Sequence, residues 1–235
     1  GNFKSNFYRR LAFDEILASL LISSEIRKKI KKTKKKSKLF SDKPFINTMS
    51  KLSFKLTNDQ KSSLLQINKD LASKSKMFRL LQGDVGSGKT IVALISALNV
   101  IESGYQVAFM APTEILARQH YNLAKNLYSN KIKLEILTGK TDYYEKKRIN
   151  KEINSKTVNI IFGTHSLFQK KIKFNDLGYI IIDEQHKFGV RQRKLLSDKG
   201  GTNCDVLLMS ATPIPRTLIM SVYGDMDISI IREKP

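Results

Sequence analysis

The stretch GDVGSGKT, residues 83–90, has the residue types and the spacing needed to hold the phosphates of a nucleotide. It fills every fixed position of the pattern G-x-x-x-x-G-K-[ST], which makes an ordinary glycine-rich turn a poor alternative. Its glycines let backbone N–H groups converge on phosphate oxygens, Lys89 can reach the β- and γ-phosphates, and Thr90 can offer a hydroxyl to Mg²⁺. The expected nucleotide-binding residues are Gly83, Asp84, Val85, Gly86, Ser87, Gly88, Lys89 and Thr90.

A phosphate loop also needs a second metal contact and a group that activates water, and YIIIDEQH, residues 179–186, provides both. Asp183 follows three isoleucines, as expected of a carboxylate that completes the shell of Mg²⁺ at the end of a buried strand. Glu184 beside it can act as the general base toward the attacking water. A buried strand that ends in Asp-Glu also occurs for structural reasons, but its pairing with the phosphate loop favours catalysis. The two motifs predict a Mg²⁺-dependent nucleoside triphosphatase.

Two other classes of phosphate-loop enzyme fit less well. A GTPase needs N-K-x-D downstream of the loop, whereas NKDL at 68 lies upstream and NKIK at 130 lacks the aspartate. A small-molecule kinase needs a substrate pocket or a lid, and no segment of the sequence indicates one. The remaining question is therefore what the hydrolysis drives.

The elements that must position these residues are apolar runs that alternate with helical patterns. The runs are continuously apolar, which is typical of strands buried on both faces of a parallel sheet. Gly104 is placed to end one helical pattern, and Thr57 or Asn58 is placed to begin another. The expected strands are 77–82, 106–111, 133–137, 157–163, 179–183, 205–210 and 228–232. We therefore predict an α/β fold whose mostly parallel sheet has helices on both faces.

The composition of the 235 residues indicates a polyanionic partner. Lys and Arg number 42 against 21 Asp and Glu, and the resulting +21 attracts nucleic acid first and acidic membrane surfaces second. A basic surface without a partner is the alternative. Cys204 is the single cysteine, which argues against a disulfide framework or a thiolate metal cluster and fits a reducing compartment. With no signal peptide and no apolar run of about eighteen residues, we expect a cytoplasmic protein without a membrane segment.

The N-terminal part of the chain differs from the rest. Apolar residues recur at helical spacing from Tyr8 to about Ile30, which predicts an amphipathic helix. RKKIKKTKKKSK, residues 27–38, then has nine basic residues in twelve. Repulsion at that density predicts a frayed helix end or a mobile linker, and contact with nucleic-acid phosphates is the alternative. Because the sequence changes character after Pro44, we expect an N-terminal helix and basic segment, 1–48, and a nucleotide-binding domain, 49–235.

Further motifs resemble those of superfamily 2 helicases. DEQH is followed by KFGVRQR (187–193) and SATPIPRT (210–217), and it is preceded by APTEILARQH (111–120) and GTHSLF (163–168). In this order they are similar to the first RecA-like, P-loop motor domain of the RecG family of bacterial branched-DNA helicases, over roughly residues 50–235. The motor of the transcription-repair coupling factor is the nearest alternative. Ser87 and Gln185 favour the RecG family, because the coupling factor typically has a bulky aromatic residue and a glutamate there.

The resemblance implies roles for further residues around the nucleotide. Gln60 would read adenine, since its amide can donate and accept at once, with a solvent-facing position on a helix as the alternative. Phe54 would stack beside the base, with a place in the core as the alternative. The catalytic group would be Lys89, Asp183, Glu184 and His186, with Thr90 and Asp183 on Mg²⁺. The residues that would couple phosphate loss to movement of the DNA-binding face are Gln185, His186, Ser210 and Thr212.

The resemblance also implies a sequence-independent grip on DNA. Short polar and basic side chains after strand ends can hold phosphates without reading bases, as a translocating motor requires. The expected contacts are Thr113, Arg118, Thr164 and His165, with Gly139 and Lys140 as weaker candidates. Arg191 and Arg193 would face DNA or a partner motor domain, or form surface ion pairs.

ATP and Mg²⁺ are the implied cofactors, and branched or forked DNA is the implied partner of a monomeric helicase in recombination and repair. Helicases of this type cleave ATP between two RecA-like domains, the second of which supplies an arginine finger. Because the chain starts at Gly1 and ends at REKP, we expect a fragment without the second motor domain and the wedge domain, and hence a weak ATPase. A basic nucleic-acid-binding module with a vestigial phosphate loop is one alternative. A DEAD-box RNA helicase is another, disfavoured because Gln185 and His186 replace Ala-Asp.

Overall fold

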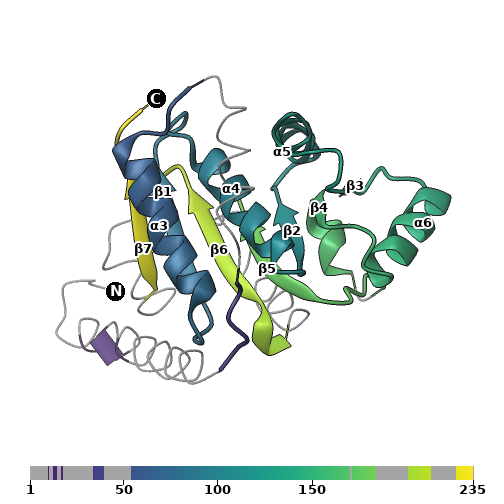
Figure 1. Cartoon of the computed structure of the whole chain (residues 1–235), viewed down its shortest axis with the longest axis horizontal. Coiled ribbons are helices and arrows are strands. Elements are labelled where there is room, and N and C mark those ends of the chain that lie inside the picture. Colours follow the sequence, from purple (N-terminus) through teal and green to yellow (C-terminus); the bar gives the residue numbers. More distant parts are fainter. Residues whose placement is uncertain are drawn as a thin grey trace.

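The computed structural model describes residues 10, 13, 14, 17, 34–39, 54–169, 171–183, 201–212 and 226–234. Within these ranges the chain forms a seven-stranded sheet in the order β3-β4-β2-β5-β6-β1-β7 (Figure 1). The strands are β1 (Phe78–Gly83), β2 (Gln106–Met110), β3 (Leu134–Leu137), β4 (Ile160–Gly163), β5 (Leu177–Ile182), β6 (Asp205–Ser210) and β7 (Asp227–Ile231). Each neighbouring pair is parallel. All seven strands coincide with the predicted runs, so the parallel α/β sheet is confirmed.

Parallel pairing brings the carboxyl ends of all the strands to one side of the sheet, which we call the carboxyl edge. The register places Gln82 of β1 beside Ser210 of β6, and Met110 of β2 beside Ile182 of β5. The phosphate loop after β1, Asp183 after β5 and the residues after β6 therefore all emerge at this edge. The sheet thus gathers motifs that are far apart in the sequence.

Helices cover both faces of the sheet, as predicted. In the described ranges they are α3 (Asn58–Ala72), α4 (Lys89–Glu102), α5 (Glu114–Leu127) and α6 (Tyr143–Asn154), with the short 3-10 helices η1 (His165–Phe168) and η3 (Gly201–Asn203). Successive residues of β5 point to opposite sides: Ile181 joins an apolar cluster with α3, α4 and α5, and Ile180 joins another that includes Ile149 and Ile153 of α6. None of the helices within the described part of the chain is long and apolar enough to span a membrane.

Local chemistry sets the helix ends that the sequence predicts. Thr57 caps α3, because its hydroxyl accepts from Gln60 N and the Gln60 side chain accepts from Thr57 N. Gly104 follows the end of α4 with a φ of 82°, a left-handed conformation that glycine adopts without strain. Of the predicted N-terminal helix, the described residues 10, 13, 14 and 17 are helical. Phe13 and Leu17 on it are 63% and 42% exposed.

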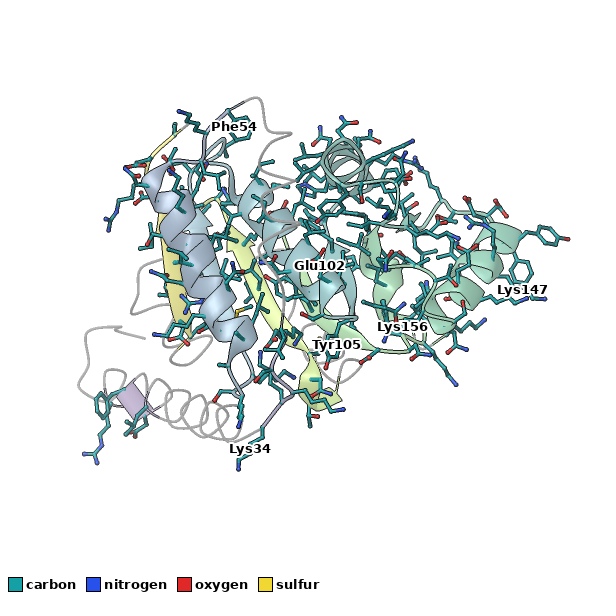
Figure 2. All side chains as sticks on the ribbon, viewed as in Figure 1. Lys34, Phe54, Glu102, Tyr105, Lys147 and Lys156 are labelled. Carbon is teal, nitrogen blue, oxygen red and sulfur yellow. The ribbon has the colours of Figure 1, made fainter. Side chains whose placement is uncertain are left out.

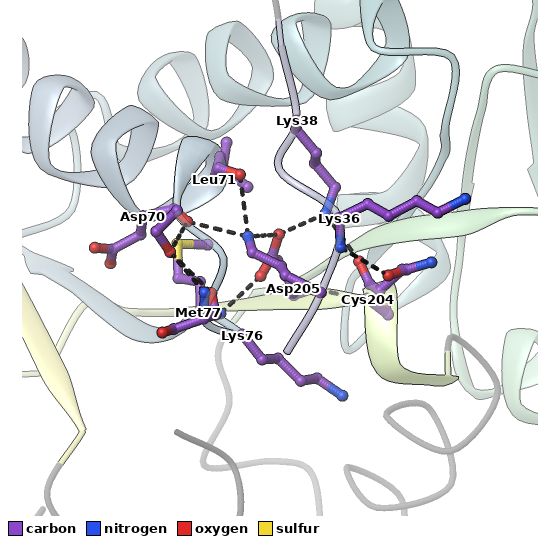
Figure 3. A network of polar contacts seen from close by, with 12 residues as sticks. Lys36, Lys38, Asp70, Leu71, Lys76, Met77, Cys204 and Asp205 are labelled. Carbon is purple, nitrogen blue, oxygen red and sulfur yellow. Dashed lines mark hydrogen bonds and ion pairs between the residues drawn. The ribbon is translucent and has the colours of Figure 1, made fainter. Parts of the chain in front are cut away.

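Two lysines at the end of the lysine-rich run, Lys35 and Lys38, are buried, and for these two residues both sequence-based interpretations were wrong. Residues 34–39 lie between the end of α3 and the amino end of β6, and Lys35 N and Lys38 N donate to Lys74 O and Leu71 O (Figure 3). Lys35 and Lys38 have side chains with no solvent exposure, and the Nζ atoms of both donate to Asp205 Oδ2 at 2.6 Å. These two lysines are therefore neither solvated nor placed to contact nucleic acid, and instead they anchor the segment to β6. The earlier part of the run, 27–33, lies outside the described residues.

A reciprocal clasp joins the start of α3 to the segment after β7. Asp59 Oδ2 accepts from Arg232 N at 2.8 Å and Glu233 N at 3.2 Å, while Glu233 Oε2 accepts from Asn58 N at 2.9 Å. The two backbone donors, Arg232 first, lower the pKa of the Asp59 carboxyl. The clasp holds the chain after β7 beside the helix that carries Gln60.

We expect this clasp to make stability depend on the protonation of Asp59. Because its folded pKa is lowered, the contribution is present above the ordinary pKa of about 4 and is lost as the pH falls through the lower, folded value. Asp59→Asn should therefore melt below the parent at pH 7, and the difference in Tm should shrink in acid. Melting curves from pH 7 to about pH 2 measure this. A difference that stays constant over this range would show that the charge on Asp59 contributes nothing.

Candidate active site

The phosphate loop lies between β1 and α4, and its shape requires its glycines. Gly86 and Gly88 have φ of 83° and 84°, the left-handed region that favours glycine. Gly83 has no room for a side chain, because a Cβ there would lie 2.6 Å from Ser87 Oγ and 2.7 Å from Ile231 O. Gly88 occupies the N-cap of α4 without a side chain, so an anion can be the acceptor for the first turn of this helix. The loop is therefore shaped to wrap an anion.

Two polar side chains are buried inside the loop. Ser87 has no solvent exposure, and among the described residues its Oγ has no hydrogen-bond partner. Lys89 Nζ donates to Gly83 O at 2.5 Å and to Asp84 O at 2.8 Å. Thr90 follows in the first turn of α4 and is half-buried. The ammonium group, the hydroxyl groups and the converging backbone thus lie together at the carboxyl edge.

Gln60 connects the start of α3 to the phosphate loop. It has no solvent exposure, and its Nε2 donates to Ser87 O at 2.8 Å while its Oε1 accepts from Thr57 N at 3.0 Å. Its side chain also lies against Gly88, where a Cβ would collide with Gln60 Nε2. Gln60 is therefore a buried neighbour of the loop and does not face solvent. One N–H and one oxygen lone pair of its amide remain beyond these two bonds.

The Ser210 to Thr212 segment is linked to the strand before the phosphate loop. Gln82 Nε2 donates to Thr212 O at 3.3 Å, and Ser210 Oγ donates to the same oxygen at 3.2 Å. The hydroxyls of Ser210 and Thr212 are 3.1 Å apart. The sequence motifs do not include Gln82. Its signal is that it is a polar residue at the end of a buried strand, directly before the phosphate loop, which indicates a contact at the carboxyl edge. Gln82 gives the segment after β6 a direct connection to β1.

Asp183 is buried directly after β5 and is held from two sides. Its backbone N–H donates to Met110 O at 2.9 Å, and its Oδ2 accepts from His120 Nε2 at 2.8 Å. The side chains of His120 and Asp183 are only 9% and 11% exposed. The sequence motifs give His120 no role. The one feature that could have indicated a buried contact is its helical spacing from Ala117 and Ala124, which share the buried side of α5.

The donor groups at the carboxyl edge fit ATP with Mg²⁺. The Thr90 hydroxyl and the Asp183 carboxylate are oxygen donors, which Mg²⁺ prefers, and at Gly86 no atom lies within 4 Å of the place where a Cβ would stand. Within the described residues no group of three or more His, Cys, Asp or Glu could hold a metal ion. Mg²⁺ needs only one or two protein oxygens when substrate phosphates supply others, so this donor set suffices.

The predicted DNA contacts that the structure describes lie over other strands of the same edge. Thr113 follows β2 and is the N-cap of α5, and Arg118 is exposed on α5 and pairs with Glu114 at 2.9 Å. Thr164 follows β4 and is half-buried, and His165 is exposed. The phosphate loop, Asp183 and Thr212 follow β1, β5 and β6, whereas these residues follow β2 and β4.

The remaining predicted residues are distributed as follows. Phe54 is 41% exposed and therefore not a core residue (Figure 2). Val85 is 81% exposed at the tip of the phosphate loop, and Gly139 and Lys140 are exposed after β3. The residues that lie outside the described ranges are Glu184, Gln185, His186, Arg191 and Arg193.

Comparison with known proteins identifies the family. Residues 57–220 match the DEAD/DEAH box helicases, which is more than half of the chain. The chain belongs to the DEAD/DEAH box helicase family. Within this family of helicases, the chain is 48% identical to the ATP-dependent DNA helicase RecG of Aquifex aeolicus and 42% identical to that of Thermotoga maritima, in both cases over 100% of its length. It covers 30% and 31% of these two relatives, so it spans about a third of a RecG protein.

Solved helicase structures confirm the RecA-like fold. The structure of RecG bound to a three-way DNA junction matches 97% of the chain, and the chain covers 30% of it, with a TM-score of 0.82 and 41% identity. The DEAD-box helicase Mss116 bound to single-stranded RNA matches 84% of the chain, which covers 46% of it, with a TM-score of 0.64 and 20% identity, and shows the fold alone. The RecG likeness implied by the helicase motifs is thus confirmed.

Proposed function

We propose that this chain is the ATP-binding motor domain, residues 49–235, of a RecG-like DNA helicase that remodels branched DNA such as stalled forks and Holliday junctions. The observation that carries the proposal is the carboxyl edge, where the phosphate loop, Asp183 and the Ser210 to Thr212 segment follow β1, β5 and β6. Identities of 42% to 52% to RecG helicases support this class over the coupling-factor motor. The proposal includes action as a monomer in the cytoplasm, in recombination and repair.

The residues around the loop have separate tasks in this proposal. Lys89 pairs with phosphate oxygens and keeps the loop closed around them. Mg²⁺, held by Thr90 and Asp183, neutralises charge that develops on the phosphates. Glu184 accepts a proton from the attacking water, and His186 is a further member of the catalytic group. Gln60 reads adenine with the part of its amide that Thr57 and Ser87 do not use.

Coupling and DNA binding use the connections between strands. Loss of the γ-phosphate changes the environment of the loop, and Gln82 passes a shift of β1 to Thr212 through its hydrogen bond. Thr113, Arg118, Thr164 and His165 hold the DNA backbone over β2 and β4 without reading bases. The nucleotide and the DNA then bind different strands of one sheet, which is how cleavage at one can move the other.

ATP turnover with nucleic acids tests the proposal. We expect the isolated chain to hydrolyse ATP slowly, because an arginine finger from a second motor domain is worth roughly 10³ to 10⁵ in turnover. A longer chain that includes the second motor domain should be strongly stimulated by forked DNA, less by plain duplex and least by RNA. A malachite-green assay of released phosphate measures both chains.

Each outcome of this assay has a distinct meaning. Robust DNA-stimulated turnover by the isolated chain would contradict dependence on a second domain. Stronger stimulation by RNA than by forked DNA would replace the DNA helicase with an RNA helicase. DNA-binding and melting measurements test the remaining alternative: if ATP changes neither the DNA affinity nor the Tm, the chain is a basic nucleic-acid-binding module with a vestigial phosphate loop.

A further inference from the structure

The structure assigns His120 as a positioning residue that holds Asp183 for Mg²⁺ and so sets the affinity of the site for the Mg²⁺–nucleotide complex. The inference rests on the proposed function, because it assumes that Asp183 is a metal ligand. It adds a residue that none of the nucleotide motifs contains. His120 belongs to α5, the helix that follows β2, whereas the phosphate loop and Asp183 follow β1 and β5.

The contact between the two side chains is short and screened from water. His120 Nε2 lies 2.8 Å from Asp183 Oδ2, and the two side chains are only 9% and 11% exposed. A carboxylate oxygen can only accept, so Nε2 carries the hydrogen and donates it. A hydrogen bond to a charged acceptor in such surroundings is stronger than one in water and restricts the rotation of the carboxylate.

The imidazole is itself fixed by apolar packing. Its ring centroid lies 4.8 Å from that of Phe109, which has no solvent exposure, and Phe109 in turn stacks on Phe162 at 5.3 Å. The Asp183 backbone is held independently, because its N–H donates to Met110 O. Strand pairing therefore fixes the backbone of Asp183, and His120 fixes the direction of its side chain. With Oδ2 occupied, Oδ1 is the oxygen that remains for a metal.

This arrangement matches the support that metal ligands usually have. Ligating carboxylates are themselves hydrogen-bonded, and loss of such an outer partner typically weakens metal binding by about 10- to 100-fold. The same helix also begins at Thr113 and carries Arg118, two of the proposed DNA contacts. If DNA binding shifts α5, the shift would therefore change the position of the Asp183 carboxylate through its hydrogen bond with His120.

The test measures nucleotide affinity with and without the metal, using a fluorescent ATP analogue in Mg²⁺ and in EDTA. For the parent chain, Mg²⁺ should strengthen binding. His120→Ala should reduce this strengthening by about tenfold while leaving the affinity in EDTA unchanged. His120→Gln, whose Nε2 can reach the position of the imidazole Nε2, should recover most of the effect. Tyr179→Phe is the matched control. Tyr179 is on β5, the strand that precedes Asp183, and the substitution removes its buried hydroxyl contact with Ser96 of α4, away from the carboxyl edge.

The outcomes separate this inference from the proposed function. If Asp183→Asn removes the Mg²⁺ effect and His120→Ala retains it, the metal site stands and the role of His120 is overturned. If His120→Gln binds the Mg²⁺ complex as weakly as His120→Ala, the hydrogen bond is not what matters and the inference also fails. If the parent shows no Mg²⁺ effect, both the proposed metal site and the inference fail. Melting curves of every variant confirm that the comparison is made on folded protein.

Discussion

Lys89→Ala should reduce the affinity of this chain for ATP about a hundredfold or more. The ammonium group lies inside the phosphate loop and donates to Gly83 O at 2.5 Å and Asp84 O at 2.8 Å. Hydrogen bonds to charged groups contribute about 1.5 to 3 kcal/mol each, and 1.4 kcal/mol is a factor of ten in affinity. Alanine removes both the positive charge for the phosphates and the two contacts that keep the loop closed. Isothermal titration with ATP and Mg²⁺ measures the loss.

The same variant should keep most of its affinity for DNA, because the proposed DNA contacts lie over β2 and β4. Fluorescence anisotropy with a labelled duplex checks this. Lys69→Ala is the matched control, since it removes one exposed lysine from α3 and leaves the loop intact. Unchanged ATP affinity in Lys89→Ala would mean that the loop does not bind phosphate. An equal loss of DNA and ATP binding would indicate that the variant is misfolded, which a melting curve would show directly.

The strands and the phosphate loop could be predicted because local sequence determines them. Runs such as YIII are apolar at every position, so only a strand covered on both faces can bury them, and the structure buries each residue of β5. Gly86 and Gly88 are required by left-handed backbone that almost no other residue adopts. Thr57 begins α3 because its hydroxyl satisfies a backbone donor within three residues. Each of these features depends on neighbours in the chain.

The contacts that could not be predicted join residues far apart in the sequence. His120 meets Asp183 across 63 positions, and Lys38 meets Asp205 across 167. The dense positive charge around Lys35 and Lys38 indicated solvent or phosphate, because nothing nearby in the sequence neutralises it. Their acceptor is a carboxylate at the start of β6, which only the folded sheet brings close. The net charge of +21 includes both lysines, although their buried side chains add nothing to an exposed basic surface.

Asp205→Ala should lower the free energy of unfolding by about 3 to 5 kcal/mol, the usual cost of removing one partner of a buried ion pair. Asp205 Oδ2 accepts from Lys35 and Lys38 at 2.6 Å, and its Oδ1 accepts from Met77 N at 2.7 Å (Figure 3). None of the three charged side chains is exposed. The substitution leaves two buried ammonium groups and one backbone donor without their carboxylate. Urea unfolding measures the change.

The pH dependence and a set of companion variants make this prediction specific to the buried charges. Burial lowers the pKa of Lys35, whereas the nearby carboxylate of Asp205 raises it. Without that carboxylate, the pKa of Lys35 should fall further in Asp205→Ala. Because the pKa of Lys35 is lower in the folded chain, the unfolded chain binds more protons, and stability rises with pH. The loss of stability in Asp205→Ala should therefore shrink as the pH rises toward about 10. Adding Lys35→Met and Lys38→Met to Asp205→Asn removes the buried charges and retains an acceptor for Met77, which should restore most of the stability.

An exposed ion pair provides the matched comparison for the buried one. Asp176 pairs with Lys156 at 3.0 Å, and both side chains are 40% exposed. Because water already solvates such a pair, Asp176→Ala should cost no more than about 1 kcal/mol. If Asp205→Ala costs as little as Asp176→Ala, the buried cluster does not anchor residues 34–39. If it costs several times more and the triple variant recovers, Asp205 anchors residues 34–39 to the amino end of β6. That end of the sheet is opposite the carboxyl edge, where ATP is proposed to bind.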